Sequence, residues 1–97
     1  MIFKIKMTPV AQQDIRIAAV WYNRQVKGLG KKFLNELRSN KKILEKNPFF
    51  AERNKGIRTL PLKKFPFMIH YTVNEKSKQV IILSVLHTAQ NPAKWPK

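Results

Sequence analysis

The N-terminal residues alternate between apolar and basic side chains. Phe3, Ile5 and Met7 fall on one side of residues 2–7, and lysines stand between them. A period of two is the spacing of side chains along one face of an extended chain. The pattern therefore predicts a short strand at the start of the domain.

Beyond this strand the pattern becomes helical. Thr8 followed by Pro9 is typical of a helix start, because a threonine side chain caps free N–H groups and proline fits the first helical position. Apolar residues then recur at steps of three and four, which predicts a helix over about residues 9–27. The main apolar stripe holds Ala11, Ile15, Ala18, Tyr22 and Val26. A second stripe holds Val10, Asp14, Ile17 and Trp21. We therefore expect this helix to pack on two sides, against the sheet and either a second helix or a partner.

A second helix follows after a short break. Gly28-Leu29-Gly30 ends the first helix, and so short a connection turns the next one back antiparallel. The second helix is predicted over about residues 31–46, because Asn47-Pro48 ends it. Its buried stripe holds Phe33, Leu37 and Leu44, with Leu34 to one side. Its opposite face holds Lys31, Asn35, Arg38, Lys42 and Lys46. The two helices are thus expected to form a hairpin with a basic outer wall.

The second half of the chain is predicted as one loop and three strands. Residues 49–56 have the pattern of a loop, and apolar residues predict strands over residues 57–62, 67–73 and 79–87. The last strand, with the run VIILSVL, is typical of a sheet centre covered on both faces. The predicted order is β-α-α-β-β-β in a single domain of residues 1–97. Because helices and strands are grouped, we expect an α+β fold, with a helical hairpin packed on a small, mostly antiparallel sheet.

The charge balance narrows the possible partners. The 97 residues include 20 Lys and Arg against 5 Asp and Glu, which gives a net charge of +15. A field of this sign attracts nucleic acid or an acidic protein. The chain shows no signal-peptide stretch, and its longest apolar run, Val80 to Leu83, is too short to span a membrane. We therefore expect a cytoplasmic protein.

Few side chains offer catalytic chemistry. The chain has no cysteine, its two histidines stand far apart in the sequence and its carboxylates stand singly. We therefore expect no metal, no cofactor and no nucleophilic triad. What remains is metal-independent RNA cleavage, which needs a base, an acid and a cation over the phosphate. Residues that could supply these groups are Arg58, Lys63, Lys64, His70, Tyr71 and His87.

The same residues also have a structural interpretation. Arg58 could lie along a sheet edge or pair with a carboxylate, and Tyr71 has the phase of the core. His70 has the phase of a partly exposed structural histidine. His87, at a strand end, could equally bond to loop backbone. Both interpretations stay open on the sequence.

Two sets of residues, in a fixed order, carry a family resemblance. The first half of the chain contains Ala11, Asp14-Ile15, Ala18, Trp21-Tyr22, Gly28-Leu29-Gly30, Phe33, Leu37 and Asn47-Pro48. The second half contains Gly56-Ile57-Arg58, Leu62-Lys63-Lys64-Phe65-Pro66-Phe67, Ile69-x-Tyr71 and the ending Val85-x-His87-Thr88-x-x-Asn91-Pro92-x-x-Trp95. In this order the motifs resemble the RelE/ParE toxin superfamily, and are most similar to its ParE-type, plasmid-stabilisation members. The resemblance covers nearly the whole chain and implies the same order of elements.

The resemblance implies the toxin of a type II toxin–antitoxin pair, which inhibits growth and is neutralised by an antitoxin from a neighbouring gene. RelE-type members cut mRNA on the ribosome, and ParE-type members trap DNA gyrase. Two departures weaken the ribonuclease interpretation. Gln90 stands where members with this ending usually carry arginine, and the C-terminal tyrosine of many RelE ribonucleases is absent, since Tyr22 and Tyr71 are the only tyrosines.

Three hypotheses for the function follow. The first is a ParE-like toxin that binds gyrase without turnover. The second is a metal-independent endoribonuclease, in which Arg58 stabilises charge and His87 acts as acid or base. The third is an inactive toxin homologue that serves as a basic nucleic-acid-binding module, with salt-sensitive binding and no growth arrest.

Candidate contact residues accompany these hypotheses. Contacts to the target or to nucleic acid are expected from Lys63, Lys64, His70 and Asn91. Contacts to the antitoxin are expected from Val10, Ile17 and Trp21. The antitoxin itself is expected to be acidic and partly disordered, to fold around the helical hairpin and to add a strand or helix over the sheet. No membrane, metal or small-molecule cofactor is expected as a partner.

Overall fold

The computed structural model describes residues 2–50 and 52–88, which form two helices and five strands. In chain order these are β1 (Lys4–Met7), α1 (Pro9–Gln25), α2 (Leu29–Lys46), β2 (Glu52–Asn54), β3 (Ile57–Pro61), β4 (Phe67–Asn74) and β5 (Gln79–His87). The predicted order β-α-α-β-β-β is confirmed, with one addition. The short strand β2 lies inside the segment that was expected to be a loop.

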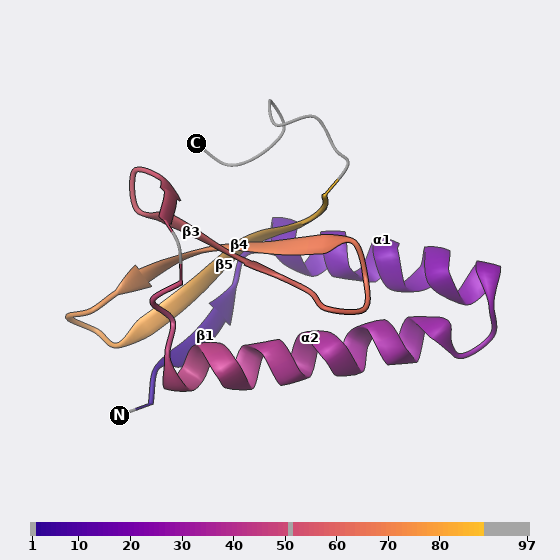
Figure 1. Cartoon of the computed structure of the whole chain (residues 1–97), viewed down its shortest axis with the longest axis horizontal. Helices are drawn as coiled ribbons and strands as arrows, with labels where there is room; N and C mark the ends of the chain where they lie inside the picture. Colours follow the sequence, from indigo (N-terminus) through magenta and orange to yellow (C-terminus); the bar gives the residue numbers. More distant parts are fainter. Residues whose placement is uncertain (1, 51, 89–97) are drawn as a thin grey trace.

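The strands form one mixed sheet in the order β1-β5-β4-β3-β2. β1 pairs with β5 in parallel, and the other neighbours are antiparallel. The helical hairpin packs against this sheet, and α2 runs along the lower side of the molecule in Figure 1. β5 is an interior strand, between β1 and β4, whereas β4 is the central one. The prediction that both faces of β5 are covered is wrong, because only one face packs against the helices. Val80, Ile82 and Val85 are buried toward the helices, whereas Ile81 and Leu83 are half-buried.

The start of α1 is fixed by the predicted cap. The Thr8 hydroxyl accepts a hydrogen bond from the Ala11 N–H at 3.1 Å and donates one to the Leu83 carbonyl at 2.9 Å. The first bond satisfies a free N–H of the helix, and the second ties the helix start to β5. One threonine therefore sets both the beginning of α1 and its position on the sheet.

The end of α1 differs from the prediction. The helix stops at Gln25, and Val26 is extended (φ −144°) with 59% of its surface exposed. Gly28 then takes a left-handed conformation (φ +86°), which reverses the chain so that α2 begins at Leu29. Val26 is therefore not part of the buried stripe, because the turn needs it outside the helix.

The hairpin is tightly packed near the turn. The Gly30 N–H donates to Asn23 Oδ1 at 3.0 Å, and a Cβ at this glycine would overlap the Ala19 carbonyl oxygen. The overlapped atom belongs to the backbone of α1, so it cannot rotate away. Gly30 thus sets how closely the two helices approach.

Aromatic rings join the hairpin to the sheet. The rings pack mostly edge to face, with centroids 4.9 to 6.0 Å apart; they belong to Tyr22 of α1, Phe33 of α2, Phe65 of the β3–β4 turn and Phe67 of β4. Such pairs stabilise beyond their buried area. Tyr71 is fully buried, as predicted, and its hydroxyl donates to the Pro48 carbonyl at 2.7 Å. Burial raises the pKa of Tyr71, so it stays a neutral core residue.

Residues 2–50 and 52–88 contain neither a membrane-spanning helix nor a cluster of metal ligands. Neither helix is both long and apolar enough to cross a membrane. No group of three His, Asp or Glu side chains there could hold a metal ion.

Candidate functional site

An apolar groove lies between α1 and the ends of β4 and β5. It has a volume of about 640 Å³. Its lining consists of Asp14, Ile17, Ala18, Trp21, Tyr22, Pro66, Phe67, Val85, Leu86 and His87. Two of the three residues expected to contact an antitoxin, Ile17 and Trp21, line this groove and are 60% and 56% exposed. The third, Val10, is exposed on the same helix.

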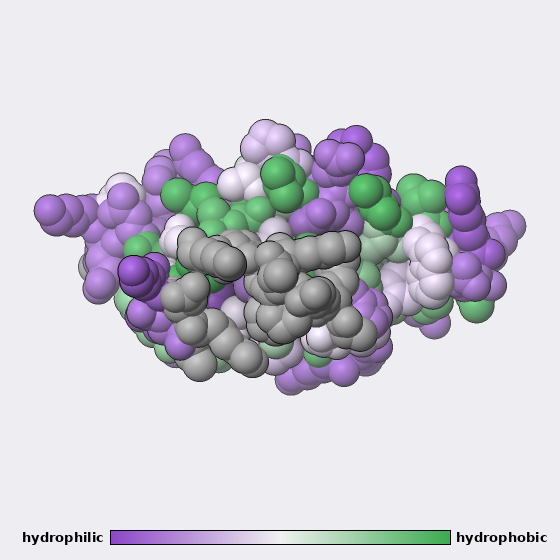
Figure 2. Space-filling view, turned by 90° about the horizontal axis from the view of Figure 1, so that it is seen from above, coloured by the Kyte–Doolittle hydropathy of each residue, from purple (hydrophilic) through white to green (hydrophobic). Residues whose placement is uncertain are grey.

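The wider surface around this groove is mixed. Figure 2 looks at the side of the molecule away from α2 and shows apolar surface emerging between polar side chains. A shallower depression on α1 is lined by Arg16, Ile17, Val20, Trp21 and Arg24. Ile17, Val20 and Trp21 are exposed and line one depression, and contiguous exposed apolar side chains of this kind mark an interaction site. The outer face of α1 therefore offers an apolar surface bordered by two arginines.

Asp14 connects α1 to β5 at the bottom of the groove. β1 pairs with β5 only as far as Met7 opposite Ile82, yet β5 continues to His87. Beyond β1 the backbone edge of β5 needs another partner, and Asp14 Oδ2 accepts the Val85 N–H at 3.1 Å. Burial raises the pKa of Asp14, and this hydrogen bond lowers it by less. Asp14 lies on the predicted second stripe with Ile17 and Trp21, but no role was predicted for it. The signal that could have indicated one was a carboxylate within an otherwise apolar stripe.

Arg58 is held in a structural arrangement. Its Nη1 donates to the Phe50 carbonyl at 2.6 Å, and its Nη2 lies 3.9 Å from Glu52 Oε1. Its guanidinium also sits over the Phe49 ring, 5.4 Å from the centroid. Of the two structural alternatives, these contacts match the pairing with a carboxylate. The sheet-edge placement is wrong, because β3 lies between β4 and β2.

His87 lies elsewhere. Its ring packs edge-on against Phe67, with centroids 5.2 Å apart, at the groove beside α1. In the sheet register His87 stands opposite Phe67 and Arg58 opposite Tyr71. The two are thus separated by about 13 Å along the strands and about 10 Å across them. Groups that share one proton-transfer site need hydrogen-bond reach, so the structure does not bring Arg58 and His87 together.

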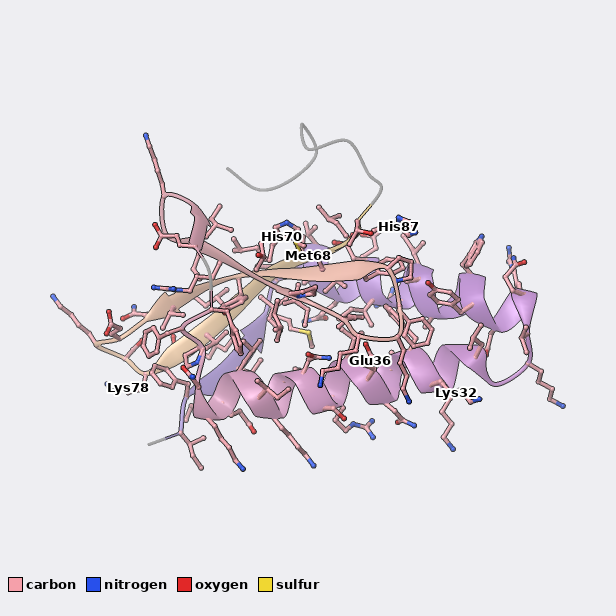
Figure 3. All side chains as sticks on the ribbon, viewed as in Figure 1. Lys32, Glu36, Met68, His70, Lys78 and His87 are labelled. Carbon is pink, nitrogen blue, oxygen red and sulfur yellow. The ribbon has the colours of Figure 1, made fainter. Side chains whose placement is uncertain are left out.

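The residues expected to contact a target are scattered as well. Lys63 and Lys64 are exposed in the β3–β4 turn, where the Lys64 N–H donates to both carboxylate oxygens of Glu36 at 3.1 Å. His70 was expected to be partly exposed, but only 1% of its surface is accessible. Figure 3 shows it beside Met68, on the side of the sheet away from α2. Asn91, like Gln90, lies outside the described residues.

The comparisons with known proteins agree with this fold. Residues 5–92 match the family described as "ParE toxin of type II toxin-antitoxin system, parDE". No curated protein matches the sequence. Among solved structures, the chromosomal ParDE toxin–antitoxin system from P. aeruginosa is similar with a TM-score of 0.77 and 21% identity, over 89% of this chain and 96% of that chain.

Two further structures come from the RelE branch. The RelBE2 toxin–antitoxin complex from Mycobacterium tuberculosis matches with a TM-score of 0.63 and 15% identity, over 90% of this chain and 99% of that chain. A mutant of the E. coli toxin RelE in the free state matches with a TM-score of 0.66 and 13% identity, over 92% and 86%. At such identities the structures show the fold, and the family follows from the match over residues 5–92. The chain belongs to the ParE toxin family of type II toxin–antitoxin systems.

Proposed function

We propose that this ParE-family toxin acts in the cytoplasm by binding DNA gyrase, without turnover of its own, and that a cognate antitoxin neutralises it by covering the outer face of α1. The observation that carries the proposal is the apolar groove of α1, in which Ile17 and Trp21 are exposed on a protein of net charge +15. The groove suits a protein partner, because polar small molecules would leave its apolar lining in contact with water.

The side chains on the outer face of α1 indicate which residues the antitoxin needs. Apolar side chains would fill the groove beside Ile17 and Trp21, and acidic side chains would pair with Arg16 and Arg24 at its border. The similar structures support such a partner, since two of them are described as a ParDE system and a RelBE2 toxin–antitoxin complex. A segment that is acidic and amphipathic meets both requirements.

The placement of the candidate catalytic residues supports binding over catalysis. Arg58 is bonded to a backbone carbonyl and to Glu52, and it lies far from His87. An endoribonuclease that used both residues would need them around one phosphate. The family match, described as ParE and not RelE, favours the same choice.

The test begins with inducible expression of the chain, alone and with the neighbouring gene. We expect growth arrest that the neighbour relieves, together with altered DNA supercoiling and intact mRNA. Purified, antitoxin-free toxin should then inhibit gyrase supercoiling. Unaffected supercoiling would overturn the gyrase proposal, and mRNA cleavage lost on Arg58→Ala or His87→Ala would establish the ribonuclease instead. Folded protein that causes no arrest would favour the nucleic-acid-binding homologue.

The antitoxin surface is tested with matched apolar truncations. We expect Trp21→Ala and Ile17→Ala each to weaken antitoxin binding about 10-fold to 100-fold, because exposed apolar anchors dominate such interfaces. Val26→Ala is the control, since Val26 is equally exposed but does not line the groove. Equal losses from all three variants would place the antitoxin elsewhere.

A further inference from the structure

A line of cations runs along the outer face of α2. We define it as the basic stripe, and its members are Lys31, Arg38, Lys42 and Lys46. All four are exposed, and they lie on the side of the helix opposite the buried Phe33, Leu37 and Leu44. In Figure 3, long side chains that end in nitrogen project from α2 on the side away from the sheet.

The stripe is not neutralised within the protein. No carboxylate of the described residues forms an ion pair with any of its four cations. Three of the five carboxylates are engaged elsewhere: Asp14 with the Val85 N–H, Glu36 with the Lys64 N–H and Glu52 with Arg58. A row of unpaired cations on a protein of net charge +15 produces a strong local potential. Its complement is a rigid or extended anion.

The dimensions of the stripe match a polyanion. From Lys31 to Lys46 an α-helix rises about 22 Å, at about 1.5 Å per residue. Duplex DNA carries one negative charge per about 1.7 Å of its axis, so about 13 phosphates lie within that length. The cations sit on a continuous helix, so their spacing is fixed before the DNA binds.

The composition of the stripe favours a duplex over a single strand. Proteins that bind single strands stack bases on exposed aromatic side chains. The aromatic residue of α2 is Phe33, which is fully buried. A stripe of cations without a stacking platform contacts phosphates only, and in a duplex the phosphates lie on the outside while the bases are already stacked.

We propose that the basic stripe of α2 binds the phosphate backbone of duplex DNA, without preference for sequence. No residue of α2 lines the apolar groove of α1. The stripe and the groove are thus separate surfaces, and DNA and a protein partner can occupy them at the same time. This inference does not depend on gyrase being the target.

The experiment measures binding of the full chain to a duplex of scrambled sequence, about 20 base pairs long, as the salt concentration is varied. If all four cations contact phosphates, the slope of log affinity against log salt is about −3.6 from these contacts alone. Raising the salt from about 50 to about 200 mM then lowers the affinity about 150-fold.

The variant combines Lys31→Gln, Lys42→Gln and Lys46→Gln, which keep good helix formers at exposed positions. We expect the slope to become shallower by about 2.7, so that the same change in salt lowers the affinity only about 3.5-fold through the remaining contact. The matched control combines Lys4→Gln, Lys6→Gln and Lys76→Gln. These lysines are also exposed, but they lie on β1 and in the β4–β5 turn. Both variants have the same net charge.

The outcomes distinguish DNA binding at the basic stripe from attraction by the overall positive charge of the protein. A shallower slope in the stripe variant alone supports the proposal, and Trp21→Ala should leave DNA binding unchanged. Equal changes in both lysine variants would show that the overall charge, and not the stripe, attracts DNA. Tighter binding to a single strand of the same length and sequence would also overturn the proposal. Circular dichroism confirms that each variant is folded before it is measured.

Discussion

α1 and α2 share one core but present opposite surfaces. Both bury an apolar stripe, and Tyr22 of the first helix and Phe33 of the second pack in the same aromatic cluster. Outward, α1 exposes Ile17 and Trp21 beside a groove, whereas α2 exposes a row of cations. The buried halves of the two helices thus determine a shared fold. Their exposed halves differ in chemistry, since one is apolar and the other cationic.

The two helices thus give a chain of 97 residues two exposed surfaces of different chemistry. An antiparallel hairpin that packs one side of each helix on the sheet leaves the other sides facing different directions. Binding to an apolar surface is favourable because water is removed from it. Binding of a phosphate backbone to a cationic surface is favourable because of charge attraction and the release of counterions. Binding at the two surfaces should therefore respond differently to salt. Substitutions in the shared core, between the helices, and at the turn and the groove test how the two surfaces depend on the fold.

The largest effect should come from the core that both helices share. Phe33→Ala removes a fully buried ring that contacts Tyr22, Phe65 and Phe67, and should lower the free energy of unfolding by about 3–5 kcal/mol. This is a large share of the about 5–15 kcal/mol that a protein of this size has in total. Because both helices share this core, the loss should weaken both surfaces together. Urea unfolding followed by circular dichroism measures the change. Leu34→Ala, at the partly exposed neighbouring position, is the control and should cost much less.

A smaller effect should come from the spacing between the helices. Alanine is favoured over glycine within a helix by about 1 kcal/mol, but at Gly30 its Cβ would overlap the Ala19 carbonyl oxygen. The helices would have to move apart, and such overpacking costs about 1–3 kcal/mol. We therefore expect Gly30→Ala to destabilise the protein, although an exposed change such as Lys31→Ala leaves stability within about 0.5 kcal/mol. A rise in the melting temperature of Gly30→Ala would show that the hairpin is looser than the structure has it.

Much of this fold could be predicted because its signals are local. Thr8 and Pro9 start a helix through their own side chains, and the run in β5 is apolar enough to mark an interior strand. β2 was missed because Glu52–Asn54 has no apolar periodicity and is a strand only through pairing with β3. The burial of His70 was missed for a related reason. Periodicity tells which side of a strand a residue occupies, but not how well that side is covered.

The candidate site was less predictable because it depends on register. Ile17 and Trp21 could be assigned to an outer stripe from spacing alone, and they do line the groove. Arg58 and His87 could be chosen as chemical types, but their separation follows from the pairing of β3, β4 and β5. The hydrogen bond from the Val85 N–H to Asp14 arises because β5 extends beyond the end of β1. No sequence motif encodes this difference in strand length.

The β3–β4 turn is attached to α2 through Glu36. Glu36 accepts the Lys64 N–H with both carboxylate oxygens, which fixes the β3–β4 turn against the helix. Glu36→Gln keeps one acceptor but loses the charge, and should lower the free energy of unfolding by about 0.5–1 kcal/mol. Hydrogen exchange of the Lys64 amide should become faster. Glu75→Gln, in the exposed β4–β5 turn, changes the net charge equally and should do neither; equal effects would attribute the loss to charge alone.

The smallest effect is a pH dependence on the α1 side. Burial raises the pKa of Asp14 above its ordinary value of 3.8, so the folded protein holds this proton more tightly than the unfolded chain. The stabilisation from protonation is fully present below the ordinary value and is lost as the pH rises through the raised pKa. Asp14→Asn cannot titrate, yet its amide oxygen can still accept the Val85 N–H. Relative to this variant, the wild type should therefore lose stability as the pH rises through that interval, as urea unfolding at a series of pH values would measure. Parallel pH profiles for the two proteins would mean that the Asp14 carboxylate is as well solvated in the folded state as in the unfolded chain, and that the floor of the groove is wetter than its apolar lining indicates.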